Sequence, residues 1–565
     1  MKKAIPVLIA IVLILIIGGA AVGSYVLEKY SYSKEEADLT EYFQIEGEQI
    51  AIIYQDEMIE EKAIRRDGVC YFDLDTVHNY LNEIFYADKG EGLLLYTTAT
   101  EVITAAFSQT VIQTSAGSVD LGYVPVFVEN EKVYVAVEYV KQYTNFSYDL
   151  FDRHMQVTAV FESNLMATVE RKTAVRLKGG VKSPVLRQLE KGETVEILEE
   201  METWSKIKTS DAYIGYVENK MLGSKTEVDS IPVNDYVAPE YTSLSMDGKV
   251  SLAWHSIGGT DGNNTLDSMV SGANGMNVIA PTWFSLSDNE GNIRSFASAS
   301  YVEKAHAYGL KVWGVLDNFN YKNENKVDIS AYEVLSVTSK RQKVVDGIVE
   351  ASLNLSLDGI NIDFEQIGEA CGIHFVQFLR ELSIKCRENG LILSVDNYVP
   401  FHFNEYYRLD IQGMITDYVI IMGYDEHWSG SGDPGSVASI NYVESGIIKT
   451  KENVPAEKVV NALPFYSILW KTEGAVVTDE YLTIRNTKDF LSRVNAEIVW
   501  DEETCQNYGE WTSGNGTYQI WLEDADSIAV KLNVMSVQEI GGVAVWRIGG
   551  GNEEVWSLIR TYLEQ

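Results

Sequence analysis

The residues best suited to chemistry lie in one short run, residues 357–365, with the sequence LDGINIDFE. Side chains alternate along a β-strand, so Asn361, Asp363 and Glu365 would share one face and the apolar residues between them the other. Burying such polar groups costs free energy unless they are hydrogen-bonded or functional. Two desolvated carboxyl groups this close have opposed pKa shifts, so one stays ionised and the other is held protonated near neutral pH. The run therefore predicts a general acid, Glu365, with Asp363 as its partner.

An alternating α/β architecture in the second half of the chain must position this run. Helical stretches, for example 339–354 and 373–389, separate many of eight apolar, β-rich segments: 249–257, 276–281, 310–316, 359–365, 391–397, 418–425, 459–464 and 541–546. This order predicts a (β/α)8 TIM barrel over residues 248–565. Glu365 would end the fourth strand, where barrel enzymes carry their catalytic groups. The long gap before the last strand predicts a small inserted α+β subdomain, rich in β-structure.

The fourth-strand run is similar to the signature D-G-x-D-x-D-x-E of glycoside hydrolase family 18, the chitinase-like enzymes. Asp358, Gly359, Asp363 and Glu365 stand at matching positions. Asn361 stands where the family usually has aspartate. An amide there can hydrogen-bond Asp363 but cannot ionise. Asparagine at this position resembles the envelope and spore-cortex branch of the family, which contains N-acetylglucosaminidases.

Other segments resemble family features at the ends of the predicted strands. Met422, Tyr424 and Asp425 match the family's M-x-Y-D, and Trp546 resembles the tryptophan on which the cleaved sugar stacks. By position, Trp254, Trp283 and Tyr466 could line outer subsites. The resemblance thus implies three catalytic residues, Glu365, Asp363 and Tyr424. It implies a larger set of substrate-binding residues: Asp358, Asn361, Met422, Asp425, Trp546, Trp254, Trp283 and Tyr466.

The resemblance also implies the reaction. A retaining hydrolase of this family cleaves β-linked N-acetylglucosamine-containing glycans with the substrate's own acetamido group as nucleophile, and it needs no cofactor and no metal. Peptidoglycan and chitin-like oligosaccharides both remain open as substrates. The alternative is a non-catalytic, lectin-like glycan-binding protein at the cell surface.

The first segment concerns localisation. Lys2 and Lys3 precede an uncharged, mostly apolar run over residues 4–27, which suits a transmembrane helix in residues 1–28 better than a shorter secretory segment. Lysines before the run would stay in the cytoplasm. We expect a single-pass cell-membrane protein with an extracytoplasmic catalytic domain. A cleaved signal peptide and a secreted protein are the alternative.

Two smaller domains are expected between this segment and the barrel. Residues 40–163 alternate strand-like and helical runs, and 69–80 resemble 132–143 at an offset of 63 residues. This region resembles the copper amine oxidase N-terminal-like domain, which implies no copper. Residues 166–224 read as short strands of a small β-barrel and resemble the bacterial SH3-like domain, which often contacts the cell wall. A spacer without a ligand is equally open. Residues 225–247 read as a linker.

The composition excludes several classes of protein. The 565 residues carry a net charge of −37, which argues against nucleic acid as a partner. A hydrophobic content of 46% excludes wholesale disorder. Four scattered cysteines without a C-x-x-C pair exclude a disulfide scaffold and make a thiolate metal site unexpected.

Overall fold

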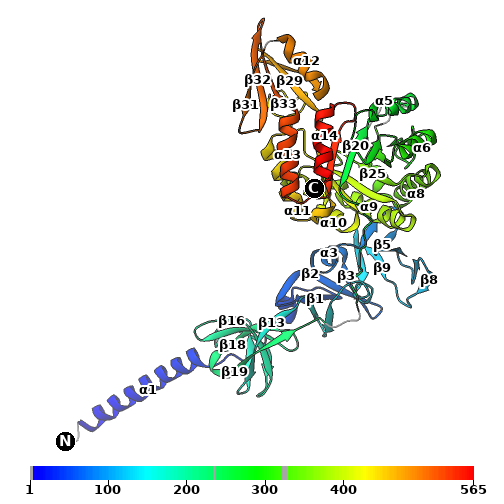
Figure 1. Cartoon of the computed structure of the whole chain (residues 1–565). Helices are drawn as coiled ribbons and strands as arrows, with labels where there is room; N and C mark the ends of the chain where they lie inside the picture. The colour runs from blue at the N-terminus through cyan, green and yellow to red at the C-terminus, as the bar shows by residue number, and fades with distance from the viewer. Residues whose placement is uncertain (1–3, 233–235, 320–327, 495) are drawn as a thin grey trace. The chain divides into compact units, whose positions relative to one another are not determined.

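The computed structural model describes residues 4–232, 236–319, 328–494 and 496–565 (Figure 1). Lys2 and Lys3, and residues 233–235 of the expected linker, lie outside the described residues. The chain divides into two compact units. One takes most of the chain up to Ala238, and the other takes Pro239–Gln565 with two short segments, Asp88–Glu91 and Thr97–Val102.

The second unit contains the predicted (β/α)8 barrel. Each neighbouring pair of strands is parallel, and β20 pairs with both β34 and β21, while β21 pairs with β24, so the ring is closed. The barrel strands are β20 (Val250–His255), β21 (Val278–Pro281), β24 (Lys311–Asp317), β25 (Gly359–Asp363), β26 (Ile392–Tyr398), β27 (Tyr418–Met422), β28 (Val459–Pro464) and β34 (Gly542–Trp546). A hairpin of β22 (Phe284–Leu286) and β23 (Ile293–Ser295) extends from β24. The prediction of a closed barrel is confirmed.

Helices follow the strands and cover the barrel. They are α5 (Leu266–Val270), α6 (Ala299–Ala307), α7 (Ala331–Leu335), α8 (Thr338–Leu355), α9 (Glu369–Asn389), α10 (Leu409–Ile415), α11 (Ile440–Lys451), α13 (Ala525–Val537) and α14 (Glu553–Leu563). Val344, Ile348 and Ser352 of α8 recur every four residues and are fully buried, as on the inner face of an amphipathic helix. Gly390, in the left-handed conformation, ends α9 and lets the chain turn into β26.

An inserted subdomain separates β28 from α13, as predicted. Its antiparallel sheet has the order β30-β29-β33-β32-β31, and Leu469, Leu482, Ile520 and Leu522 form its small apolar core. The elements are β29 (Tyr466–Glu473), β30 (Val476–Thr483), α12 (Ile484–Val494), β31 (Glu497–Asp501), β32 (Gln506–Ser513) and β33 (Gly516–Leu522).

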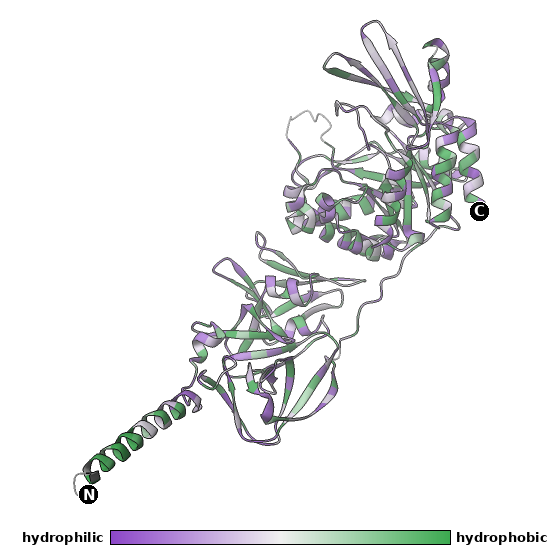
Figure 2. Ribbon diagram, turned by 90° about the vertical axis from the view of Figure 1, so that its left-hand side faces the viewer, coloured by the Kyte–Doolittle hydropathy of each residue, from purple (hydrophilic) through white to green (hydrophobic). Residues whose placement is uncertain are grey.

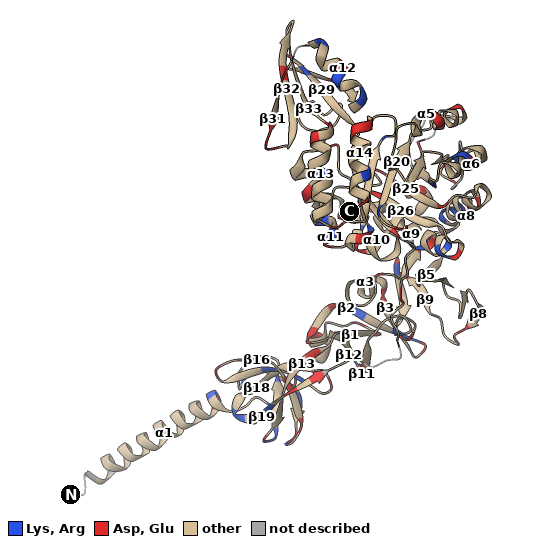
Figure 3. Cartoon of the chain, viewed as in Figure 1, with Lys and Arg blue, Asp and Glu red and all other residues tan. Residues whose placement is uncertain are grey.

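The first unit begins with α1 (Ala4–Tyr30). Within it, the 24 residues Val7–Tyr30 are long and apolar enough to cross a membrane, with a mean hydropathy of 2.8, and a signal sequence would meet the same test. The helix is hydrophobic along most of its length, and its charged residues lie at its carboxyl-terminal end (Figures 2 and 3). The predicted apolar helix is confirmed.

An α+β domain follows α1. Its main sheet has the order β11-β12-β1-β2-β3-β10-β9, and a second sheet runs from β4 to β8. Its helices are α2 (Leu39–Phe43), α3 (Leu74–Tyr80) and α4 (Val137–Lys141). Its strands are β1 (Gln49–Tyr54), β2 (Glu57–Arg66), β3 (Val69–Asp73), β4 (Tyr86–Asp88), β5 (Leu93–Thr97), β6 (Val102–Ala106), β7 (Val111–Thr114), β8 (Gly117–Asp120), β9 (Val126–Glu129), β10 (Lys132–Ala136), β11 (Ser147–Leu150) and β12 (His154–Thr158).

A small antiparallel β-domain completes the first unit, in the strand order β15-β14-β18-β17-β16-β13-β19. Its core contains Val169, Val175, Leu189, Val195, Ile207 and Val217. The strands are β13 (Glu162–Val169), β14 (Thr173–Arg176), β15 (Val185–Leu189), β16 (Thr194–Glu200), β17 (Trp204–Thr209), β18 (Ile214–Glu218) and β19 (Leu222–Ser230). The predicted small β-barrel is confirmed.

Candidate active site at the mouth of the barrel

Strand β25 presents Asn361 and Asp363 to the barrel interior, and Glu365 follows directly after the strand. In the strand register, Asn361 lies beside Ser394 of β26 and Asp363 beside Asp317 of β24. Asn318 holds the backbone of Glu365 from both sides: its Nδ2 donates to the Glu365 carbonyl at 2.8 Å, and its Oδ1 accepts from the Glu365 N–H at 2.9 Å. The direction in which the Glu365 side chain leaves the backbone is thereby restricted.

Glu365 has the environment of a proton donor. Its side chain is partly buried, and the Tyr398 hydroxyl donates to its Oε2 at 2.7 Å. Burial raises the pKa of Glu365 above its usual value of 4.5, while the hydrogen bond from Tyr398 partly opposes the shift. A raised pKa keeps a larger fraction of this carboxyl protonated near neutral pH.

Asp363 is the less satisfied of the two acids. It is 9% exposed, and its Oδ1 has no hydrogen-bond partner among the described residues. Burial raises the pKa of Asp363 well above 3.8, and the nearby carboxyls Asp396, Glu365 and Asp317 raise it further. An unpaired buried acceptor is costly, and an N–H donor on a bound molecule would satisfy it.

Asn361 is fully buried and does not make the expected bond to Asp363. Its Oδ1 accepts from the Trp254 indole N–H at 3.0 Å, and its Nδ2 donates to Ser394 Oγ at 3.0 Å and to Asp396 Oδ1 at 2.8 Å. The amide therefore ties β25 to the neighbouring strand β26 rather than to the next acid on its own strand.

A cavity of about 480 Å³ opens above these acids. Its lining combines carboxyl groups with aromatic rings: Trp254, Phe319, Asp363, Glu365, Gln366, Asp396, Tyr398, Met422, Tyr424, Asp425, Trp428, Ser429, Tyr442, Tyr481 and Trp546. The rings of Trp254 and Trp546 lie with centroids 6.1 Å apart at 58°. Burial raises the pKa of Tyr424 well above 10, so its hydroxyl stays protonated as a donor. Flat apolar walls over hydrogen-bonding acids suit a sugar ring.

Seven of the eleven residues singled out in the sequence line this cavity: Glu365, Asp363, Tyr424, Met422, Asp425, Trp254 and Trp546. Asn361 lies beneath it, and Tyr466 reaches it indirectly. The Tyr466 hydroxyl donates to Asp425 Oδ1 at 2.5 Å from an adjacent cavity of about 650 Å³, which Asp425 and Trp546 share.

The structure places two expected substrate-binding residues elsewhere. Asp358 lies just before β25, where it accepts hydrogen bonds from Lys311, His306 and the Val312 N–H, so it joins β24 to β25 at the amino end of the barrel. Trp283 is fully buried and donates its indole N–H to Asn263 at 2.8 Å. Neither lines the catalytic cavity.

Several lining residues were missed by the sequence reasoning. Asp396, at the end of the fifth strand, was suggestive by position only, and Tyr398 was not expected; the two alternate on β26 as the acids do on β25, and this period-2 pattern is the signal that could have found both. Trp428 follows the M-x-Y-D segment, and Tyr481 belongs to β30 of the inserted subdomain. No local pattern predicts that an inserted strand reaches the barrel mouth.

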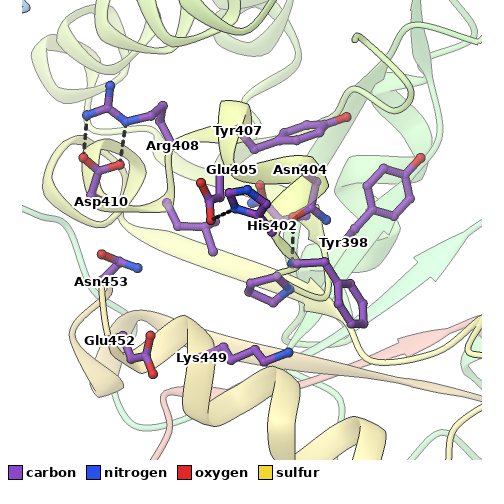
Figure 4. A pocket seen from close by; sticks show the side chains of 14 residues that line it. Tyr398, His402, Asn404, Glu405, Tyr407, Arg408, Asp410, Lys449, Glu452 and Asn453 are labelled. Carbon is purple, nitrogen blue, oxygen red and sulfur yellow. Dashed lines mark hydrogen bonds and ion pairs between the residues drawn. The ribbon is translucent and has the colours of Figure 1, made fainter. Parts of the chain in front are cut away.

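A second cavity, of about 560 Å³, also borders Tyr398, but neither Asp363 nor Glu365 lines it (Figure 4). Two of its acids are paired with basic side chains: Asp410 with Arg408 at 2.6 Å and Glu405 with His402 at 2.8 Å. Lys449 of α11 lies over the Phe401 ring at 4.6 Å. This charge balance differs from the group of carboxyls at the barrel mouth, and we place the candidate chemistry at the mouth.

Comparison with known proteins agrees with this geometry. The chain is 26% identical over 327 residues to the protein named uncharacterized glycosylase YvbX of Bacillus subtilis, which covers 55% of this chain and 92% of that protein. It is 26% identical over 252 residues to the cortical fragment-lytic enzyme of Bacillus anthracis, over 42% of this chain and 57% of that enzyme.

Among solved structures, the spore cortex-lytic enzyme SleL of Bacillus cereus shares the fold, with a TM-score of 0.50 and 21% identity over 58% of this chain and 77% of that chain. Residues 282–551 match the family described as Glycosyl hydrolases family 18, and residues 172–223 match the Bacterial SH3 domain. The barrel unit of this chain thus contains a glycosyl hydrolase family 18 domain, preceded in the chain by a bacterial SH3 domain.

Proposed function

We propose that the chain is a retaining glycoside hydrolase that cleaves β-linked N-acetylglucosamine-containing glycans by substrate-assisted catalysis. The observation that carries the proposal is that a partly buried acid, Glu365, lies with a buried acceptor, Asp363 Oδ1, under an aromatic-walled cavity, and that this acceptor has no partner within the described part of the chain. The first group can give a proton to a leaving oxygen. The second can accept the N–H of a 2-acetamido group.

The proposed reaction has two steps. Glu365 protonates the glycosidic oxygen while the substrate's acetamido oxygen attacks the anomeric carbon, which gives a cyclic oxazolinium ion and the released alcohol. Asp363 accepts the acetamido N–H and stabilises the positive charge, and the Tyr424 hydroxyl holds the acetamido oxygen. Water, deprotonated by Glu365, then opens the ring from the opposite face, so the product keeps the β-configuration.

The remaining assignments of the site are proposals of the same kind. We assign Trp546 and Trp254 to stacking on the sugar ring, and Met422 and Asp425 to the wall of the cavity. Asn361 and Tyr466 act through the neighbours that they bond. The reaction as written uses no metal and no cofactor.

The proposed substrate is glycan of a bacterial envelope. The name of the Bacillus anthracis relative, a cortical fragment-lytic enzyme, supports peptidoglycan fragments, and chitin oligosaccharides remain the second candidate. We propose that α1 anchors the chain in the cell membrane, that the catalytic domain lies outside the cytoplasm, and that the SH3 domain meets the cell wall. We also propose a copper amine oxidase N-terminal-like domain for residues 40–163: β3 runs into α3, β10 runs into α4, and β3 pairs with β10, which supports two repeated units.

Product analysis tests the proposal. The full-length chain in detergent micelles would be incubated with muropeptides and, separately, with chitin oligosaccharides, and the products analysed by mass spectrometry. We expect new N-acetylglucosamine-containing fragments from at least one substrate and none with Glu365→Gln. Binding without any product would favour the lectin-like alternative, which the Asn361 departure from the family signature makes worth testing.

A further inference from the structure

The contacts of Asp396 explain how the site can function with asparagine at position 361, where the family signature has aspartate. Ile362 lies beside Val395 in the parallel register of β25 and β26, and continuing that register puts Asp396 beside Asp363. Both acids are buried and line the same cavity. Asn361 donates its Nδ2 to Asp396 Oδ1 at 2.8 Å, whereas Asp363 Oδ1 receives no bond from the described residues.

These contacts decide which acid keeps the proton. Two adjacent buried carboxyls do not both ionise, because each charge repels the other. Burial raises the pKa of Asp396 as well, but the hydrogen bond that Asn361 donates to it opposes this rise, whereas Asp363 Oδ1 receives no such bond from the described residues. Of the two acids, Asp396 is therefore the one that is stabilised as the anion. Asp363 then retains the shared proton while the cavity is empty.

We propose that Asp396 is a positioning residue that supplies, from the next strand, the carboxyl group that Asn361 lacks. It holds Asp363 neutral in the empty site. Asp363 must release this proton before it can accept an acetamido N–H as the anion. This inference rests on the proposed function, since it concerns how Asp363 becomes ready to accept the substrate.

Other titratable side chains also lie close to Asp363 and Asp396. Asp317 of β24 lies beside Asp363 in the register and accepts the Phe319 N–H at 3.1 Å. Glu365 follows Asp363 on its own strand, and Tyr398 and Tyr424 present hydroxyls from β26 and from the segment after β27. Removing Asp396 removes a negative neighbour of Asp363, so the pKa of Asp363 falls.

The test exchanges the carboxyl and amide groups at positions 396 and 361 and measures the pH dependence of kcat/KM. Asp363 must be ionised to accept the N–H, so the acidic limb reports its pKa. We expect Asp396→Asn to move this limb to lower pH by about one unit, a tenfold change on the limb. The double variant Asn361→Asp/Asp396→Asn returns the carboxyl to β25 and brings the limb back towards the wild type.

Two controls separate this role from packing. Ser394→Ala removes an uncharged partner of Asn361 and should leave the limb in place. Asp317→Asn should move it less than Asp396→Asn does. An unmoved limb in Asp396→Asn, an equal or larger shift in Asp317→Asn, or a double variant no closer to the wild type than the single one would overturn the proposal.

A measurement without substrate keeps the proposal distinct from the hydrolase activity. The infrared C=O band of protonated carboxyls can be titrated in the full-length chain. We expect a component that persists near neutral pH in the wild type, titrates at lower pH in Asp396→Asn and returns in the double variant. If the wild type cleaves no glycan but shows this pattern, the proposed function fails and the proton assignment stands. If Asp396→Asn titrates as the wild type does, the assignment fails.

A different observation, in the first unit, carries a second inference. The segment directly after α1 pairs with β15, an edge strand of the SH3 domain. The Val185 N–H donates to the Glu35 carbonyl and the Ala37 N–H to the Val185 carbonyl, both at 2.8 Å, and the Ser33 N–H donates to the Val181 carbonyl at 2.7 Å.

Side chains fix the same segment along the domain. Arg176, 4% exposed, donates to the Ser33 carbonyl at 3.1 Å and lies over the Tyr32 ring at 5.4 Å. The Tyr42 hydroxyl donates to the Ile214 carbonyl at 2.7 Å and accepts the Ile214 N–H at 3.0 Å. Strand addition of this kind is how many domains bind extended peptides.

We infer that the extended residues 31–37, which precede α2, act as the SH3 domain's own bound peptide. While this segment is bound, the edge is closed to wall peptides; this inference rests on the proposed contact of the SH3 domain with the cell wall. Ser33→Pro/Ala37→Pro removes two of the N–H donors without altering the domain. Lys34→Pro, whose N–H donates no hydrogen bond within the described residues, is the matched control.

Hydrogen exchange of the full-length chain should show protected Ala37 and Val185 amides, with protection lost at Val185 in the double-proline variant. When the chain is sedimented with purified peptidoglycan sacculi, the amount of co-sedimenting protein should be several-fold higher for that variant than for the wild type or Lys34→Pro. Rapid exchange at both amides in the wild type would overturn the inference. So would unchanged sedimentation of a variant whose segment has been released.

Discussion

Two sets of buried carboxyl groups in the barrel unit differ in their partners. Among the helices and the inserted subdomain, Glu381 pairs with Arg341 at 2.9 Å and Glu523 pairs with Lys531 at 2.5 Å, and all four side chains are at most 4% exposed. At the barrel mouth, the charged neighbours that act on Asp363 and Asp396 among the described residues are further carboxyls.

The difference separates structural acids from functional ones. A buried charge is costly unless it is paired, and breaking a buried pair is strongly destabilising. The outer pairs therefore hold elements together: Glu523, at the end of β33, also accepts from Gln506 of β32 and Ser527 of α13. The carboxyl groups at the barrel mouth lower the stability of the folded chain, and such a cost is expected where activity requires it.

Glu365→Gln should give the largest effect on activity. The amide keeps the shape of the side chain but cannot donate an acidic proton, so kcat should fall by roughly 10²–10⁴-fold. Steady-state kinetics measures the fall. Glu369→Gln, an exposed change of the same type at the start of α9, should retain wild-type kcat. Turnover of Glu365→Gln at the wild-type rate would remove Glu365 from the mechanism.

Lys531→Met should give the largest effect on stability. It leaves Glu523 buried without its cation, which typically costs about 3–5 kcal/mol. Thermal or denaturant unfolding measures the loss. Lys172→Met breaks an exposed pair with Glu190, whose side chains are 65% and 62% exposed, and should change stability by less than about 1 kcal/mol. Equal losses in the two variants would contradict the distinction between buried and exposed pairs.

Tyr398→Phe should shift the alkaline limb of the pH–rate profile. The Tyr398 hydroxyl donates to Glu365 and favours its ionised form, so removing it raises the pKa of Glu365. A general acid works while it is protonated, and activity is lost as the pH rises through its pKa. The limb should therefore move to higher pH in kcat/KM measurements. A shift to lower pH would mean that Tyr398 acts on another group.

Asp363→Asn should give the smallest predicted change in stability, which is a gain. Because the folded-state pKa of Asp363 is raised above 3.8, its favourable contribution is present below that pH and is lost as the pH rises through the folded-state pKa. An amide avoids the loss. Unfolding temperatures should rise by a few degrees at neutral pH and change little at about pH 3, while activity falls. A lower unfolding temperature at neutral pH would indicate that the carboxyl is structural.

The alternation of side chains along strands explains which site residues could be predicted from the sequence and why Trp283 and Asp358 do not line the cavity. The order of strands and helices predicted the closed barrel, and period 2 predicted the shared face of the β25 acids. The same rule argues against Trp283. Trp254 lines the cavity and lies beside Ala280 in the register, so residue 282 continues the inner face and residue 283 points outward. Asp358 lies outside the inner face for the same reason.

Other parts of the site depend on contacts between distant segments. Tyr398 reaches Glu365 from the neighbouring strand β26, and Asn318 holds the Glu365 backbone from the loop after β24. Tyr481 comes from the inserted subdomain, which has a small apolar core of its own, and it lines the cavity beside residues of the barrel strands. Tertiary contacts of this kind leave no periodic signal in the sequence.

The central claim is that the substrate provides the nucleophile while Glu365 provides the proton. The most direct measurement compares an oligosaccharide that carries N-acetylglucosamine at the cleaved position with the same oligosaccharide bearing a free amine there, with the anomer of the first product followed by NMR at early times. We expect cleavage of the acetylated sugar alone, with a β-anomeric product. Comparable cleavage of the free amine, or an initial α-anomer, would contradict it.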